Sequence, residues 1–282
     1  MYLQCGAHRL ELSRPNIMGI LNVTPDSFSD GGSYYQDGDL LLDLVLKRAE
    51  QMLAEGADIL DIGGESTRPG AQSISEQQEL DRVIPVVDAL VSKLGALVSV
   101  DTSNAQVITE SAAKGASIIN DVRALQRPGA LEAAAKTGLP VCLMHMQGEP
   151  STMQAAPLYD DVVMDVSEFL GQRIKACKLA GIDSSRILID PGFGFGKTLA
   201  HNLALLNRLP ELALLGCPIL VGLSRKSLLQ QLLGRPVNAR LAGSLALALA
   251  AAQRGAAIIR VHDVGATKDV LTVLDAVNAQ YR

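Results

Sequence analysis

The chain of 282 residues has no tryptophan, and aromatic residues make up only 3% of it. Its core must therefore be aliphatic, and a hydrophobic fraction of 48% is ample for one large core. Long apolar runs are missing as well. The longest, residues 245–252, is far too short to span a bilayer, and the N-terminus lacks the apolar stretch of a signal peptide. We therefore expect a cytoplasmic protein with no membrane partner.

Cysteine and positive charge are also scarce. The four cysteines follow no regular spacing and form no CxxC pair, so the sequence indicates neither a zinc site nor a redox pair. Cys142 and Cys217 lie in apolar runs, where we expect small buried thiols. The charges, 25 Lys and Arg against 30 Asp and Glu, sum to −5 and include no basic run or stripe. This balance argues against nucleic acid as a partner.

What the chain does have is a regular alternation of short apolar runs with longer amphipathic stretches. Each run is almost continuously apolar, as strands buried on both faces of a parallel sheet are. Residues 40–54, after the first run, carry apolar side chains at helical spacing. Glycines that favour helix termination follow several such stretches, at Gly56, Gly115, Gly181 and Gly255. The eight runs begin at Ile17, Asp58, Ala96, Ser117, Pro140, Arg186, Pro218 and Ala257.

Eight strand–helix units without a break in composition predict one α/β domain over residues 1–282, a closed TIM (β/α)8 barrel. A doubly wound open sheet is the alternative, which the number and regularity of the units disfavour. We expect the first residues to form a short hairpin or cap under the barrel.

Nearly every predicted strand is followed by a polar residue, and in a barrel these ends share the face that carries catalysis. An aspartate after a strand is often only the N-cap of the next helix, and for Asp61 and Asp101 this reading is as good as a functional one. Asn120 lies inside an apolar run, where an amide needs a specific partner, so a function is favoured. The full set is Asn22, Asp61, Asp101, Asn120, Asp121, His145, Asp190, Ser224, Arg225, Lys226, Arg260 and His262.

The sequence around the last two strands predicts an anion site. Loops after strands 7 and 8 usually bind phosphate in this fold. Arg225, Lys226, Arg260 and His262, with the helix start after Ser224, predict a pocket for phosphate or pyrophosphate. The stretch DPGFGFGKT from Asp190 fails both the Walker and the dinucleotide patterns. Its glycines are interpreted as a wall that lets backbone approach a flat ligand.

Three further features have simpler interpretations. His145, between two methionines, is interpreted as a packed structural residue, and His201 as part of a helix start. The loops that begin at Asn22 and Gly63 are long and rich in Gly, Ser and Asp. Loops of this length usually act as lids, although plain disordered connections are the alternative.

The motifs MGILNVTPDSFSDGG, DIGGESTRPGA, VDTS, IINDV, LMHMQG, DPGFGFGK, GLSRKS and RVHD together resemble the bacterial dihydropteroate synthases, in order over about residues 15–265. The resemblance implies a transferase of folate biosynthesis. It would condense 6-hydroxymethyl-7,8-dihydropterin pyrophosphate with para-aminobenzoate, giving 7,8-dihydropteroate and pyrophosphate. A homodimer through the outer helices of the later repeats, and competition by sulfonamides, are further implications.

The resemblance also implies roles for individual residues. The pterin ring would be bound by Asp101, Asn120, Asp190 and Lys226. The pyrophosphate would be held by Asn22, Thr67, Arg68, Arg260 and His262, with Asn22 acting through Mg²⁺. The para-aminobenzoate pocket and mobile loops would include Phe28, Asp30, Pro69, Phe195 and Ser227. Catalysis would depend on Asp101, Lys226, Arg260 and His262.

Three other functions remain as alternatives. A pterin-dependent methyltransferase domain has no leaving pyrophosphate, so the SRKS and RVHD segments and the long first loop argue against it. A non-catalytic pterin-binding homologue would have lost a ligand, yet every motif position is filled. A phosphate-sugar barrel enzyme would keep the anion pocket but needs neither the two carboxylates nor the amide.

Overall fold

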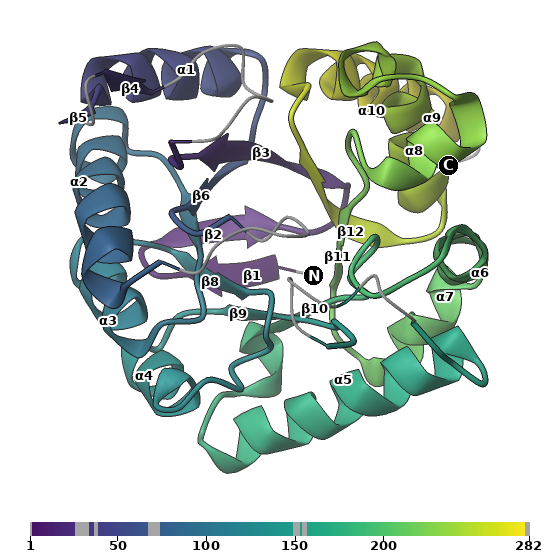
Figure 1. Ribbon diagram of the computed structural model, residues 1–282, viewed down its shortest axis with the longest axis horizontal. Coiled ribbons are helices and arrows are strands. Elements are labelled where there is room, and N and C mark those ends of the chain that lie inside the picture. Colours follow the sequence, from purple (N-terminus) through teal and green to yellow (C-terminus); the bar gives the residue numbers. More distant parts are fainter. Residues whose placement is uncertain are drawn as a thin grey trace.

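The computed structural model describes residues 2–25, 34–36, 39–66, 74–148, 153 and 157–279. In these residues, eight parallel strands close into a barrel in the order β10-β11-β12-β3-β6-β7-β8-β9, and β9 pairs with β10 (Figure 1). The strands are β3 (Asn16–Asn22), β6 (Ile59–Gly63), β7 (Val98–Asp101), β8 (Ile118–Asp121), β9 (Val141–Met144), β10 (Ile187–Asp190), β11 (Ile219–Gly222) and β12 (Ala256–Val261). The predicted TIM barrel is confirmed, and each predicted apolar run contains one strand.

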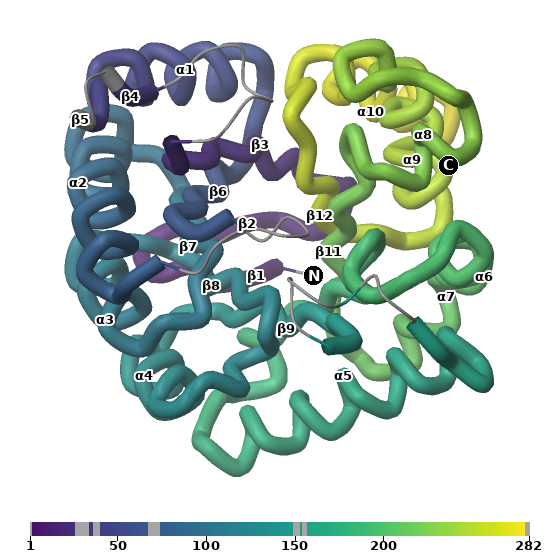
Figure 2. Tube along the Cα trace, in the orientation of Figure 1, coloured from purple at the N-terminus to yellow at the C-terminus, as the bar shows by residue number. Residues whose placement is uncertain are grey.

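Helices surround the barrel, and the chain passes once around it, so that β12 pairs with β3 (Figure 2). The α-helices are α1 (Leu42–Ala54), α2 (Glu76–Leu94), α3 (Ala105–Ala113), α4 (Ala130–Thr137), α5 (Val162–Leu179), α6 (Leu199–Asn207), α7 (Leu209–Leu212), α8 (Ser227–Leu233), α9 (Leu241–Gln253) and α10 (Val264–Ala279). Short 3₁₀ segments are η2 (Ser184–Arg186), η3 (Ala213–Leu215) and η4 (Val237–Ala239), and β4 (Tyr35–Gln36) pairs with β5 (Asp39–Leu40).

The helix ends follow the local sequence. Gly56, Gly115, Gly181 and Gly255 have φ of +100°, +92°, +91° and +90°, which confirms them as helix stops. Helix α2 starts with a capping box, in which Ser75 and Gln78 satisfy each other's backbone N–H groups. Where the described residues were searched, no helix is both long and apolar enough to cross a membrane.

The lower barrel interior is an apolar layer closed by the predicted hairpin. Strands β1 (Tyr2–Cys5) and β2 (His8–Glu11) pair antiparallel and lie within the ring of strands in Figure 1. Their side chains Leu3, Cys5 and Leu10 pack on inward residues of the barrel. Those inward residues are Met18, Ile59, Ile118, Cys142, Leu188, Leu220 and Ile258. All four cysteines are free and buried, as predicted for Cys142 and Cys217.

The hairpin is expected to contribute to stability through Leu3, which is only 1% exposed. Leu3→Ala should lower the free energy of unfolding by about 2–5 kcal/mol, because it removes buried methyl groups and leaves a cavity. Chemical denaturation measures the change. Leu214→Ala, at a side chain that is 89% exposed, is the control and should change stability by less than about 0.5 kcal/mol. Equal effects of the two substitutions would contradict the packing of the β1–β2 hairpin against the barrel interior.

Candidate active site

Directly above the apolar layer, the barrel interior becomes polar. Residues i and i+2 of a strand point to the same face. The residues two positions after Ile59, Ile118, Leu188 and Ile258 are therefore also inward. They are Asp61 in the middle of β6, and Asn120, Asp190 and Arg260 in the last two residues of their strands. The alternation thus builds a polar mouth on an apolar floor.

Arg260 lies between two carboxylates. Its Nε donates to Asp61 Oδ2 at 2.6 Å, and its Nη2 donates to Asp101 Oδ2 at 3.2 Å. Asn120 Nδ2 lies 3.3 Å from the same oxygen of Asp61. The Asp61 side chain is fully buried, whereas those of Asp101 and Arg260 remain 13% and 19% exposed to the mouth. The two exposed groups can therefore contact a ligand, while Asp61 supports them from below.

The electrostatics of this cluster reflect competition between burial and pairing. Burial raises the pKa of Asp101, and the charge of Asp61 adds to the rise, while Arg260 opposes it. Burial works against the charge on Arg260, but Asp61 and Asp101 outweigh it and raise the pKa of the guanidinium. The capping interpretation of the two aspartates is wrong, since Ser75 caps α2 and Asn104 caps α3.

Asp190 and Lys226 are two further ionisable groups of the mouth, and each affects the pKa of the other. Burial raises the pKa of Asp190 to about 6, although its carboxylate accepts the Gly192 N–H at 2.7 Å. Burial and the charge of Arg260 lower the pKa of Lys226 to about 8, against the attraction of Asp190. Lys226 Nζ lies 4.1 Å from the ring centroid of Phe195, and Ser227 is exposed at the first position of α8. Lys226 therefore connects the floor of the mouth with its rim.

The loop between β10 and α6 is held tightly against the segment after β9. At Gly192, with φ of +70°, a Cβ would lie 1.8 Å from the His145 carbonyl oxygen. Lys197, only 3% exposed, places Nζ 2.9 Å from His145 Nδ1 and 3.0 Å from the carbonyl oxygens of Gly192 and Phe195. Close approach of two protein segments thus explains the need for glycine at position 192.

The histidines of this region are structural, as interpreted from the sequence. His145 is buried, and burial followed by the charge of Lys197 lowers its pKa to about 3. Burial in turn lowers the pKa of Lys197 to about 7. His201 forms a capping box with Thr198 at the start of α6. Asp121 points outward from β8 and accepts the N–H groups of Arg123 and Leu125, so it shapes a turn.

Asn22 ends β3 opposite Gly63 of β6, and its side chain is partly exposed. A Cβ at Gly63 would lie 3.2 Å from Asn22 Oδ1 and 3.7 Å from Asp101 Cβ. The absence of a side chain at Gly63 therefore leaves a gap between Asn22 and Asp101. In the part of the chain that the structure describes, no three His, Cys, Asp or Glu side chains are grouped as metal ligands.

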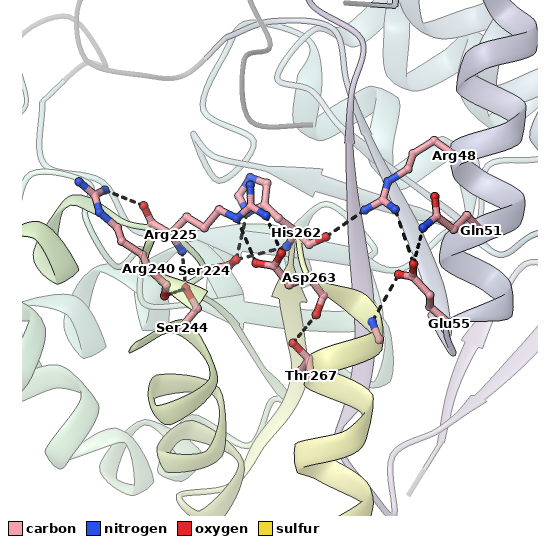
Figure 3. A network of polar contacts seen from close by, with 11 residues as sticks. Arg48, Gln51, Glu55, Ser224, Arg225, Arg240, Ser244, His262, Asp263 and Thr267 are labelled. Carbon is pink, nitrogen blue, oxygen red and sulfur yellow. Dashed lines mark hydrogen bonds and ion pairs between the residues drawn. The ribbon is translucent and has the colours of Figure 1, made fainter. Parts of the chain in front are cut away.

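His262, Ser224 and Arg225 lie together where the chain leaves β11 and β12 (Figure 3). Ser224 Oγ lies 3.0 Å from His262 Nδ1 and accepts the His262 backbone N–H at 3.2 Å. Arg225 donates from Nε to Asp263 Oδ2 at 3.0 Å and from Nη2 to the other oxygen. The prediction grouped Arg225 with the anion ligands, but its guanidinium is paired with Asp263.

The structure thus brings together most of the residues that the resemblance implied. Asn22, Asp101, Asn120, Asp190, Phe195, Lys226, Ser227, Arg260 and His262 all lie at the carboxyl ends of the barrel strands or in the segments that follow them. Phe28, Asp30, Thr67, Arg68 and Pro69 lie outside the described residues. Asp61 was among the polar residues that follow the predicted strands, but no role in ligand binding was assigned to it. Its position two residues after an inward isoleucine was the available signal.

The fold and the charged mouth define a TIM-barrel enzyme, and comparisons with known proteins identify its family. A family model described as pterin binding enzyme matches residues 18–262. The dihydropteroate synthase of Escherichia coli K12 is 57% identical over 267 residues, which cover 95% of this chain and 93% of that protein. The chain belongs to the dihydropteroate synthase family of pterin-binding enzymes, and it is therefore a transferase.

Solved structures agree with this assignment. The Yersinia pestis dihydropteroate synthase in a sulfonamide drug complex has a TM-score of 0.95 and 56% identity, covering 99% of this chain and 100% of that chain. The Xanthomonas albilineans enzyme with 4-aminobenzoic acid has a TM-score of 0.91 and 52% identity, covering 99% of this chain and 98% of that chain.

Removing the central guanidinium should destabilise the barrel in a pH-dependent way. Arg260→Met is expected to lower the free energy of unfolding by about 3–5 kcal/mol near pH 8, because Asp61 and Asp101 lose their buried counter-ion. Without Arg260 the pKa of Asp101 rises further above its unfolded value. A carboxyl with a raised folded-state pKa loses stability as pH rises, so the deficit should be smaller at pH 5 than at pH 8.

Denaturant titrations of both proteins at pH 5 and pH 8 measure this difference. Arg14→Met serves as the control, since Arg14 pairs with Asp58 at 2.6 Å on the opposite, exposed end of the barrel. That variant should lose less than about 1 kcal/mol at either pH. A pH-independent deficit in Arg260→Met would contradict the proposed role of the carboxylates.

Proposed function

We propose that this chain condenses 6-hydroxymethyl-7,8-dihydropterin pyrophosphate with para-aminobenzoate to give 7,8-dihydropteroate and pyrophosphate. The observation that carries the proposal is the polar mouth on an apolar floor, in a chain of this family. The mouth combines carboxylates, an amide and a lysine that are fixed on barrel strands or next to them. Such rigid donors and acceptors suit a fused ring rich in hydrogen-bonding groups.

The pterin ring is proposed to bind deepest in the mouth. Asp101, Asn120 and Asp190 accept and donate hydrogen bonds along its nitrogen-rich edges, and Lys226 donates to its ring carbonyl. Asp61 stabilises this arrangement because it orients both Arg260 and Asn120. The partial exposure of Asp101 and Arg260 supports contact with the ligand.

The pyrophosphate is proposed to lie at the mouth against Arg260, His262 and Asn22, with Thr67 and Arg68 completing the site. Asn22 would also hold Mg²⁺ through Oδ1. The fit is good, because the gap at Gly63 leaves this oxygen room, and Mg²⁺ typically takes one or two protein oxygens and otherwise phosphates and water. When bound, Mg²⁺ supplies positive charge that stabilises the leaving pyrophosphate.

Para-aminobenzoate is proposed to bind at the rim, between Phe195, Lys226 and Ser227, with Phe28, Asp30 and Pro69 contributed by the loops. The proximity of Phe195 to Lys226 Nζ supports a shared rim site, and 4-aminobenzoic acid is the ligand of the Xanthomonas albilineans relative. Sulfonamides are proposed to compete for this position. The Yersinia pestis relative has been solved with such a drug.

The reaction is an alkyl transfer that needs no covalent intermediate with the protein. The C–O bond to pyrophosphate breaks, the arylamine nitrogen bonds to the CH₂ carbon, and that nitrogen then releases one proton. Arg260 and His262 stabilise the negative charge that develops on the leaving group. The ionised form of Asp101, which Arg260 favours, stabilises the positive charge that develops on the pterin beside the carbon under attack.

The proposal extends to the state of the protein in the cell. A homodimer is supported by apolar side chains that remain exposed on the outer helices of the later repeats. These include Leu232, Leu233, Leu241, Val273 and Val277. A cytoplasmic location is supported by four buried cysteines that are all free thiols.

The first experiment is an assay with the pterin pyrophosphate and Mg²⁺, with and without para-aminobenzoate. We expect dihydropteroate to form with one pyrophosphate released per product, and activity to be lost with EDTA and restored by Mg²⁺. Tight pterin binding without turnover would favour the non-catalytic or methyltransferase alternative. Absence of pterin binding would refute the assignment of the mouth.

Pterin binding should have a bell-shaped pH dependence. Below about pH 6 Asp190 takes up a proton and no longer accepts two N–H groups, and above about pH 8 Lys226 loses the proton that it donates. The affinity of 6-hydroxymethyl-7,8-dihydropterin, measured by calorimetry from pH 5 to pH 9, should therefore peak near pH 7. Asp190→Asn should weaken binding by about 10²–10³-fold and abolish the acid limb.

A matched control for this substitution is Asp88→Asn, at a carboxylate that is 54% exposed on α2. It removes the same charge far from the mouth and should leave the pH dependence of pterin affinity unchanged. An acid limb that persists in Asp190→Asn would assign that titration to another group.

A further inference from the structure

Arg225 adopts a backbone conformation that its side chain disfavours. Among the described residues, the non-glycine positions with positive φ are Ala124, Leu125 and Arg225, and the φ of Arg225 is +56°. A Cβ makes this left-handed region unfavourable, so the surrounding structure must hold the residue there. Both of its chain neighbours contact residues of the site, since Ser224 contacts His262 and Lys226 contacts Phe195.

Two residues from the start of α9 hold the backbone of Arg225 (Figure 3). The Arg225 N–H donates to Ser244 Oγ at 3.0 Å, and the Arg225 carbonyl accepts from Arg240 Nη1 at 3.0 Å. Arg240 is only 6% exposed, and it also donates to the Lys226 carbonyl at 3.3 Å and to Gln230 Oε1 at 2.8 Å. Both backbone groups of the left-handed residue are thus bound by buried side chains.

The side chain of Arg225 is held by Asp263, in the segment that follows the neighbouring strand β12. Its guanidinium forms two hydrogen bonds with the Asp263 carboxylate, in which the two side chains are 25% and 20% exposed. Asp263 directly follows His262, and its carbonyl accepts from Thr267 Oγ1 in the first turn of α10. A single ion pair therefore joins the loop after β11 to the loop after β12.

The consequence is a fixed spatial relation between two groups of the site. Because Arg225 is locked at positive φ, the chain turns sharply between Ser224 and Lys226. Ser224 Oγ contacts both the backbone and the ring of His262, while Lys226 Nζ reaches Phe195. A change in the conformation of Arg225 would displace Ser224 and Lys226 together.

We propose that Arg225 and Asp263 are positioning residues, which set the geometry of Lys226 and His262 through the left-handed turn, and that Arg225 is not itself an anion ligand. The inference rests on the proposed function, because it concerns how that reaction's rim and anion groups are placed. The competing possibility is that Arg225 leaves Asp263 and binds the anion directly. The two possibilities predict opposite changes in pyrophosphate affinity when the Asp263 carboxylate is removed.

Asp263→Asn distinguishes them, with inorganic pyrophosphate and Mg²⁺ as the probe for calorimetry on the full chain. If Arg225 only positions its neighbours, weakening its ion pair with Asp263 should weaken pyrophosphate binding by about 5- to 10-fold. It should also lower kcat/KM for para-aminobenzoate by about 10- to 100-fold. If Arg225 is a ligand, removing its competitor should tighten pyrophosphate binding. Tighter binding overturns the proposal.

The matched control is Asp161→Asn, because Arg208 donates to both oxygens of Asp161 at 2.8 and 3.0 Å in a similar paired arrangement at the start of α5. Among the described residues, the contacts of Asp161 and Arg208 include no group that is proposed to bind a substrate, so the variant should keep both the pyrophosphate affinity and kcat/KM. A loss in Asp161→Asn as large as that in Asp263→Asn would show a general effect of breaking an ion pair, and would overturn the positioning role.

Two substitutions at position 225 test the conformation itself. Arg225→Gly removes the guanidinium but accepts positive φ without strain, whereas Arg225→Ala removes it and keeps a Cβ. The proposal predicts that kcat/KM of Arg225→Gly is at least about 5-fold higher than kcat/KM of Arg225→Ala. Equal losses would overturn it. Since pyrophosphate binding is measured without turnover, the test with Asp263→Asn stays decisive even if the unsubstituted protein fails the synthase assay.

Discussion

The site depends on one guanidinium held between two carboxylates inside the barrel, directly above an apolar floor. Arg260 contacts Asp61 below and Asp101 beside it, and Asp61 is fully buried. A buried carboxylate without this partner would be strongly unfavourable, and so would a lone guanidinium. Because Arg260 offsets much of the negative charge of the two carboxylates, the barrel tolerates charged groups next to its apolar floor. Asp101 and Arg260 can then face a ligand in fixed orientations.

The same device recurs around the rim with different partners. Lys197 is buried against His145 and two carbonyls, which joins the loop after β10 to the segment after β9. Arg225 and Asp263 join the loops after β11 and β12. In each case a charged side chain with satisfied hydrogen bonds fixes two loops that come from different strands. The mouth is rigid on this half because the loops are joined to each other as well as to the barrel.

The sequence predicted the fold well because its signals are local. Continuous apolar runs, helical spacing and glycine stops depend on neighbouring residues, and the eight strands were found from them. The roles of Asp61 and Arg225 depend on partners that are 199 and 38 residues away, and no local pattern indicates such pairs. The inward position of Asp61 could have been predicted, because it lies two residues after the inward residue Ile59. The left-handed conformation of Arg225 had no signal, since glycine is the residue expected there.

The hairpin plug has a consequence for how the protein is made. Its apolar layer joins Leu3 to Ile258, so the first and last parts of the chain share one packed cluster. A nascent chain emerges from the ribosome N-terminus first, so Leu3 is made long before Ile258. The cluster can be completed, and the barrel closed, only after β12 has been synthesised.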